Sequence, residues 1–303
     1  MKRNIALVLS SGGARGIAHI GVIEELLDSG YNITSIAGAS MGALVGGMQA
    51  KGTLPEFKEW LLSVTKMEML KFMDLAVGHG GLIKGEKIMK VVGEYIGDVN
   101  IENLPIPFSC VAADLEGHRE VVFNSGNLLL AIRASCSIPT VFLPVYHKNM
   151  RLVDGGVLNP LPLDLVKRSP DDMLVAVNVN ANIPYEPVNH EIKQLQEQEI
   201  HYSKMRAALN EKWSGLIDLY VEKYRKGRPA KPKPYNLFDV ISDSIILAQN
   251  KAASLYIDKY NPDIVIETSV DICSTFDFYK SEELIEAGRV ACRKALEKVE
   301  ITN

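Results

Sequence analysis

The stretch Gly38-Ala39-Ser40-Met41-Gly42 has the form Gly-x-Ser-x-Gly and follows the β-rich residues Ile36-Ala37. A serine in this pattern lies on a sharp turn from a strand into a helix, where the two glycines allow the backbone to crowd without a Cβ clash. The turn exposes the hydroxyl, and the N-terminus of the following helix favours a developing negative charge. Ser40 is therefore a candidate nucleophile. A plain tight turn of small residues fits the same pattern, so both interpretations stay open at this point.

A glycine loop near the N-terminus could stabilise an anion. Residues Ser10–Gly16 follow the strand-like run Ile5–Leu9 and open a helix of apolar periodicity that reaches Leu27. In such an arrangement the loop amides converge at the helix N-terminus, which is a site for negative charge. The candidate oxyanion donors are the backbone amides of Gly12, Gly13, Ala14 and Arg15. For the Arg15 side chain we expect a structural role, fixing the loop through neighbouring carbonyls, rather than contact with a lipid phosphate.

The third chemical signal is a carboxylate at the end of a strand. Arg151-Leu152-Val153-Asp154 leads directly into the tight turn Gly155-Gly156. A serine hydroxyl is a poor nucleophile at neutral pH and needs a base within hydrogen-bond reach, which Asp154 could supply. A nucleophile, oxyanion donors and a base are together the three parts that acyl transfer requires.

In their order and spacing, these three motifs resemble those of the bacterial patatin-like phospholipases. Cys110–Leu115, Ala131–Ser135 and Ser137–Pro144 support the resemblance, which covers about residues 5 to 179 well and the final strand and helix more loosely. One departure is Ser11, which stands where the family has the first glycine of its oxyanion loop; the amides that follow stay available.

The resemblance implies a fold and a reaction. The fold is α/β, a three-layer α/β/α arrangement with a mainly parallel central sheet. The reaction is hydrolysis of fatty-acyl esters of phospholipids or lysophospholipids, in which Ser40 attacks and Asp154 alone serves as base, without a histidine. Serine triads place a histidine between the two. None of the six histidines fits a motif, and we expect none to act as the base; they are His19, His79, His118, His147, His190 and His201.

Two other classes of function compete with this interpretation. A nucleotide-binding module is disfavoured because Ser10–Gly16 lacks the Gly-Lys-Ser/Thr ending of a P-loop, and no acidic residue follows at the spacing of a dinucleotide fold. A binding or adaptor protein that retains the fold with little catalysis stays open, because fold alone does not prove function.

Charge, cysteine spacing and apolar content exclude several classes of partner and cofactor. The formal net charge of −4 argues against a nucleic-acid binder. Cys110, Cys136, Cys273 and Cys292 lack CxxC or zinc spacing, so we expect reduced thiols of an intracellular protein, and neither a metal nor an organic cofactor. No apolar run reaches the length of a membrane span. We therefore expect a cytoplasmic protein, with peripheral contact to the inner membrane face as an option, and infer no oligomeric state.

The elements that must position these residues follow from hydrophobic periodicity. The chain is expected to form one domain over residues 1–303, with a motif-bearing core at about 5–180, a helical insertion and basic linker at about 189–234, and a C-terminal helix-strand-helix at about 238–300. For the insertion, packing on the parent domain, contact with lipid and self-association all stay open.

The expected strands are Ile5–Leu9, Ile33–Ala39, the hairpin Pro105–Asp114 with His118–Phe123, one that ends at Asp154, the buried run Met173–Val179, and Asp263–Glu267. The expected helices run from the glycine loop to Gly30, then over Ala43–Gln49, within Pro55–Met73, and over Gly85–Gly97, Leu128–Cys136, Phe238–Tyr260 and Glu282–Val299.

Overall fold

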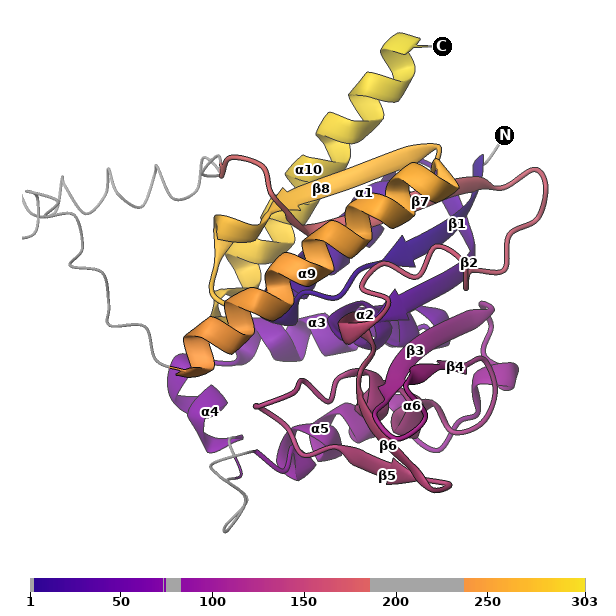
Figure 1. The fold of residues 1–303 in the computed structure, drawn as a ribbon. Coiled ribbons are helices and arrows are strands. Elements are labelled where there is room, and N and C mark those ends of the chain that lie inside the picture. The colour runs from indigo at the N-terminus through magenta and orange to yellow at the C-terminus, as the bar shows by residue number, and fades with distance from the viewer. Residues whose placement is uncertain (1–2, 73, 75–82, 186–236, 303) are drawn as a thin grey trace, which may run out of the picture. The chain divides into compact units, whose positions relative to one another are not determined.

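The structure is a computed structural model that describes residues 3–72, 74, 83–185 and 237–302. These residues form a mixed eight-stranded sheet in the order β5-β6-β3-β2-β1-β7-β8, with β4 paired to β3 beside this path (Figure 1). The strands are β1 (Arg3–Leu9), β2 (Tyr31–Ala39), β3 (Phe108–Asp114), β4 (Arg119–Phe123), β5 (Val145–His147), β6 (Met150–Asp154), β7 (Met173–Ala181) and β8 (Ile264–Ser269). The pairs β1–β2, β2–β3, β1–β7 and β7–β8 are parallel, and the pairs of β3 with β4, β3 with β6 and β5 with β6 are antiparallel.

Eight α-helices lie among the described residues. They are α1 (Ala18–Asp28), α2 (Met41–Lys51), α3 (Leu54–Ser63), α4 (Lys66–Lys71), α5 (Glu86–Ile96), α6 (Leu128–Ser135), α9 (Leu237–Tyr260) and α10 (Ser281–Thr302), with short 3₁₀ turns that include η1 (Gly13–Ile17) and η3 (Gly155–Val157). Gly52 ends α2 in the left-handed conformation, at φ 87°, which glycine adopts without a Cβ penalty. Asn127 caps α6, because its side chain accepts a hydrogen bond from the Leu130 amide at 2.9 Å.

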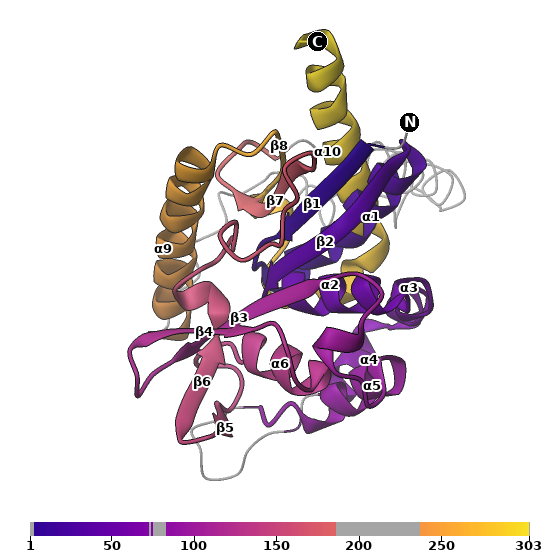
Figure 2. The ribbon, with the colours of Figure 1, turned by 90° about the vertical axis from the view of Figure 1, so that its right-hand side faces the viewer.

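Successive side chains of β1 point to opposite faces of the sheet, and each face has its own apolar core. Ile5, Leu7 and Leu9 of β1 belong to a core cluster with residues of α1, α2 and α10, whereas Ala6 and Val8 belong to a second cluster that includes Ala253 of α9. Figure 2 shows α9 on one face of the sheet and α1, α2 and α10 on the other. The expected three-layer α/β/α fold with a mainly parallel sheet is therefore confirmed.

The sheet departs from the expectation at one side. Beside the hairpin of Pro105–Asp114 with His118–Phe123, the sequence predicts parallel pairing, but two further pairs, β3 with β6 and β5 with β6, are antiparallel. The pairing of β4 with β3 confirms the hairpin read from the sequence. The hairpin of β5 with β6 was not predicted, because β5 has only three residues; it turns through Lys148 and Asn149, which both have positive φ. The region Pro55–Met73 also forms two helices, α3 and α4, rather than one.

Contacts divide the chain into two units, Met1–Tyr185 with Ile245–Asn303, and Glu186–Ser244. Of the second unit the structure describes only residues 237–244, which are the first turns of α9. The insertion expected at 189–234 lies outside the described residues, so the single-domain assignment stays a prediction. None of the helices in the described ranges combines the length and the apolar run that crossing a bilayer requires.

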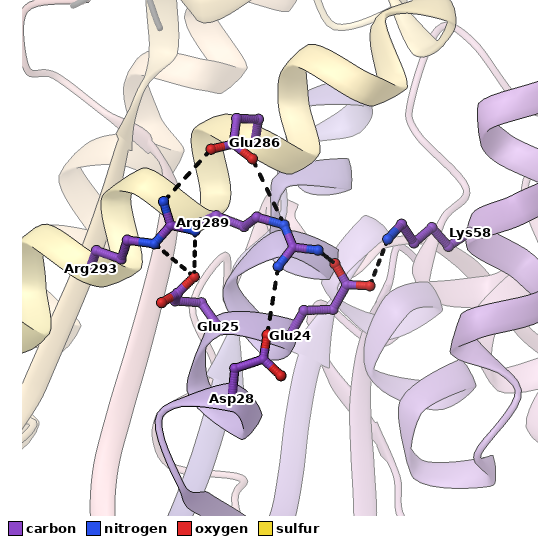
Figure 3. A network of polar contacts seen from close by, with 7 residues as sticks. All are labelled: Glu24, Glu25, Asp28, Lys58, Glu286, Arg289 and Arg293. Atoms are coloured by element: carbon purple, nitrogen blue, oxygen red, sulfur yellow. Dashed lines mark hydrogen bonds and ion pairs between the residues drawn. The ribbon is translucent and has the colours of Figure 1, made fainter. Parts of the chain in front are cut away.

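Helices α1 and α10 pack with their backbones in close approach. A Cβ at Gly21 would lie 1.8 Å from the Ile285 carbonyl oxygen, and one at Gly288 would lie 2.0 Å from that of Ala18. Beside this contact, ion pairs join Arg289 and Arg293 of α10 to α1, and Lys58 of α3 joins the same group (Figure 3). The acidic partners are Glu24, Glu25, Asp28 and Glu286.

Candidate active site

Ser40 stands on the sharp turn that the glycine pattern predicts. It lies between the end of β2 and the start of α2, with φ 53° and ψ −121°, a conformation rare for a residue with a Cβ. The turn needs its glycines, since a Cβ at Gly38 would lie 2.4 Å from the Gly42 carbonyl oxygen, and one at Gly42 would lie 2.3 Å from that of Leu9. The residue is 3% exposed.

Asp154 meets Ser40 from the neighbouring part of the sheet. It ends β6, which pairs with β3, and β3 in turn pairs with β2. The Ser40 hydroxyl donates to Asp154 Oδ2 at 2.5 Å, and the Gly156 amide donates to Asp154 Oδ1 at 2.8 Å. Gly155 lets the strand end approach β3, because a Cβ there would lie 2.1 Å from the Val111 carbonyl oxygen. The two residues singled out as nucleophile and base are thus in direct contact.

Burial raises the pKa of the Asp154 carboxyl group. Removal from water raises the pKa of Asp154 to about 7, against the opposing effect of the hydrogen bonds from Ser40 and Gly156, which favour the ionised form. A group with a pKa near neutrality can both accept and return a proton at physiological pH.

The described histidines lie elsewhere. His19 is fully buried in α1, with its Nε2 2.9 Å from the Ser10 carbonyl oxygen, and burial lowers its pKa to about 4. Its neutral ring therefore donates to the glycine loop. His118 lies in the turn between β3 and β4, and His147 ends β5. Within the described ranges, neither Ser40 nor Asp154 is hydrogen-bonded to a histidine; His79 falls outside those ranges.

The glycine loop and Ser40 share one cavity. Gly13, at φ 55°, lines the same cavity as Ser40. The Ala14 amide donates to the Thr275 carbonyl at 2.9 Å. The assignment of the Gly12, Gly13, Ala14 and Arg15 amides as oxyanion donors stays a prediction. A Cβ on Gly13 would also lie 2.6 Å from Thr275 Cγ2.

The Arg15 side chain fixes the loop from behind. It is 3% exposed and donates from Nε to Asn180 Oδ1 at 2.6 Å, and from Nη1 to the Cys273 carbonyl at 3.1 Å. Asn180 in turn donates to the Ser11 carbonyl at 2.9 Å. Sequence reasoning predicted a loop-fixing arginine but missed Asn180 and the segment around Thr275, which carry no local motif and meet the loop only in three dimensions.

An apolar cavity of about 90 Å³ opens beside Ser40. Its wall comes from α2, α5, α6, the segment before β5 and the 3₁₀ turn Phe278–Lys280, and it includes Leu44, Ile88, Val92, Ile132, Phe142 and Phe278. Such a lining suits a hydrocarbon chain. Across the described part of the chain, no group of three or more His, Cys, Asp or Glu residues is placed to hold a metal ion.

The end of α6 touches the backbone of both Ser40 and Asp154. The Ser40 amide donates to Ser135 Oγ at 2.9 Å, Cys136 Sγ donates to the Ser40 carbonyl at 3.1 Å, and the Asp154 amide donates to the Ser137 carbonyl at 2.9 Å. These residues belong to the stretch that supported the family resemblance, but their contacts were not foreseen.

A family model of patatin-like phospholipases matches residues 7–167, more than half of the chain. The chain belongs to the patatin-like phospholipase family. An uncharacterized NTE family protein of Mycobacterium tuberculosis is 35% identical over an alignment of 336 residues, which covers 98% of this chain and 92% of the relative. The neuropathy target esterase of Drosophila melanogaster is 29% identical over 185 residues, 59% of this chain and 13% of its own length.

Among solved structures, VipD from Legionella pneumophila matches this patatin-like protein with a TM-score of 0.47 and 14% identity, over 98% of this chain and 67% of that one. Membership of the family implies a lipid acyl hydrolase.

Proposed function

We propose that this patatin-like protein cleaves fatty-acyl esters of phospholipids or lysophospholipids with Ser40 as nucleophile and Asp154 as general base. The observation that carries the proposal is the 2.5 Å contact between the Ser40 hydroxyl, on its strained turn, and the buried Asp154 carboxylate. A base in hydrogen-bond contact with the hydroxyl is what activates a serine.

The reaction proceeds in two halves. Asp154 takes the proton of Ser40 as the oxygen attacks the ester carbonyl carbon, and backbone amides of the glycine loop stabilise the oxyanion of the tetrahedral intermediate. Collapse of the intermediate breaks the ester bond, the proton passes from Asp154 to the leaving alkoxide, and the acyl group stays on Ser40. Asp154 then deprotonates a water that attacks the acyl-enzyme. The fatty acid leaves and Ser40 regains its proton.

The apolar cavity beside Ser40 favours the proposal that the acyl chain is the part of the substrate bound there. Its lining carries ten apolar side chains, if Cys136 is counted among them, and one charged group, Arg133. The rival proposal is an adaptor on the same fold with little catalysis, and it differs in one respect: it needs no activated serine.

Labelling with a fluorophosphonate probe, followed by peptide mapping, separates the two proposals. We expect modification of the peptide that contains Ser40 and no modification of the Ser40→Ala variant. Ser63→Ala changes a serine whose hydroxyl donates locally to the Trp60 carbonyl, and it serves as the matched control. A folded wild-type protein that takes no label and hydrolyses no p-nitrophenyl ester would favour the adaptor.

A further inference from the structure

Arg133 lies between the end of α6 and the wall of the acyl cavity. Its Nη1 donates to Ser137 Oγ at 2.6 Å, and the carbonyl of the same Ser137 accepts the Asp154 amide at 2.9 Å. Ser137 Oγ donates back to the Arg133 carbonyl at 2.8 Å, so the two residues form a closed pair. Through Ser137, one side of the guanidinium is thus connected to the backbone of Asp154, the proposed base.

The other side of the guanidinium holds two separate chain segments. Arg133 Nη2 donates to the Lys84 carbonyl at 2.8 Å and to the Leu143 carbonyl at 3.0 Å. These bonds are charge-assisted, and a planar guanidinium fixes their direction as well as their length.

The two segments that Arg133 holds form one wall of the cavity. Gly85 and Phe142 both line it, and Ile83 pairs with the segment of Phe142 through hydrogen bonds from the Ile83 amide to the Val141 carbonyl at 2.7 Å and from the Leu143 amide to the Ile83 carbonyl at 3.0 Å. The guanidinium carbon also lies 5.8 Å from the centre of the Phe142 ring. With both terminal nitrogens bonded inside the protein, Arg133 is built to hold this wall.

We propose that Arg133 is a positioning residue that fixes this wall of the acyl cavity relative to Ser40 and Asp154, so that a long acyl chain delivers its ester carbonyl to the serine in the correct place. The inference rests on the proposed function. An acetyl group does not reach the wall and gains nothing from its position. A long chain lies against the wall, so a displaced wall displaces the ester carbonyl, and misplacements of this kind lower turnover strongly.

The test compares two substrates in one variant. In Arg133→Met, which keeps the apolar stem and removes the guanidinium, the ratio of kcat/KM for p-nitrophenyl octanoate to that for p-nitrophenyl acetate should fall by about tenfold, mainly through kcat. Arg168→Met is the matched control, because Arg168 also bonds a backbone carbonyl and a side chain, those of Asp172 and Asp263, away from the site. It should leave the ratio unchanged. Equal losses on both esters in Arg133→Met, which a general structural defect would give, overturn the proposal.

Ser137→Ala provides a milder second variant. It removes the hydroxyl that Arg133 contacts and keeps the carbonyl that Asp154 contacts, so it should lower the same ratio, and the double variant should lose little more than Arg133→Met alone. Independent, multiplying effects of the two substitutions would contradict the proposed link. Fluorophosphonate labelling of every variant identifies the other kind of failure: if wild-type Ser40 takes no label, the proposed function itself fails. If Ser40 is labelled and the ratio is unchanged in Arg133→Met, only the role of Arg133 fails.

Discussion

Ser40 and Asp154 are both almost fully buried, so the low polarity around them sets the pKa of the Asp154 carboxyl group. A carboxyl group with a pKa of about 7 is only partly ionised at neutral pH, and only the ionised form can take the proton of Ser40. We expect kcat/KM for a p-nitrophenyl ester to rise about tenfold per pH unit below neutrality and to level off above a pH of about 7. A profile measured from about pH 5 to about pH 9 checks this. A rise centred near the ordinary pKa of an aspartate would contradict it.

The same shift predicts how stability changes with pH. Because the pKa of Asp154 is higher in the folded chain than its ordinary value of 3.8, the folded state binds the proton more tightly, and the free energy of unfolding falls as pH rises from about 4 to about 7. The loss is at most about 4 kcal/mol. The uncharged Asp154→Asn variant should lack this dependence, so the difference in Tm between the variant and wild type should grow in favour of the variant over that range. A constant difference would count against the burial of an ionised Asp154.

Backbone strain at Ser40 gives a third prediction at the scale of the residue. The combination of φ 53° and ψ −121° suits glycine and penalises any side chain. Ser40→Gly and Ser40→Ala should both lose hydrolysis, yet the glycine variant should be more stable by about 1 kcal/mol, because relief of strain outweighs the added freedom of the unfolded chain. Urea unfolding of the two variants measures the difference. An alanine variant that is more stable than the glycine variant would show that the turn is unstrained.

At the site, the sequence could predict the groups that a short motif carries. Ser40, Asp154 and the glycine loop each occupy a turn whose residues are adjacent in the chain. Asn180, Thr275 and the end of α6 act through backbone atoms or from distant segments, which no local pattern reports. The engagement of the Ala14 amide by the Thr275 carbonyl is of this kind.

Elements were predictable where periodicity is strong and length sufficient. The buried run of β7 and the amphipathic α10 have clear patterns, whereas the three-residue β5 falls below any periodic signal, and the antiparallel side of the sheet depends on pairing between strands that are distant in sequence. Strand direction is a tertiary property, and an alternation of helices and strands predicts it only on average.

The contact of α1 with α10 allows a test of backbone packing against surface charge. Gly288→Ala places a Cβ against the Ala18 carbonyl and should destabilise the protein by about 2 kcal/mol or more, although alanine is the better helix former. Arg293→Ala, which removes a half-exposed ion pair with Glu25, should cost less than about 1 kcal/mol.

Gly93→Ala is the matched control for the glycine substitution. Gly93 also lies within a helix, but a Cβ there meets only the end of the Leu129 side chain, at 3.2 Å. Its effect on urea unfolding should be near zero or stabilising. If Gly288→Ala behaves in the same way, the two helices can move apart without loss.

At the scale of the whole molecule, a deletion tests the segment at 189–234, which lies outside the described residues. Ser40, Asp154 and the glycine loop all lie outside this segment in the sequence, so we expect a chain in which a short glycine-serine bridge replaces Glu191–Lys231 to fold and to hydrolyse a water-soluble ester at the wild-type rate. The basic and aromatic composition of the segment predicts weaker co-sedimentation with anionic vesicles after its removal. Unchanged vesicle binding would show that lipid contact, if present, lies elsewhere.

The position of β1 at the centre of the sheet has a consequence for biosynthesis. β1 pairs with β7, where Ile5 faces Met173, and α1 is covered by α10, with a sequence separation of 265 between Glu24 and Arg289. At about 5 to 20 residues per second, a ribosome needs roughly 15 to 50 s to travel between these two points. Throughout that time the apolar face of α1 lacks its partner and the glycine loop lacks the Thr275 carbonyl that orders it. The nascent chain therefore carries Ser40, the proposed nucleophile, long before it contains every segment that packs around the proposed site.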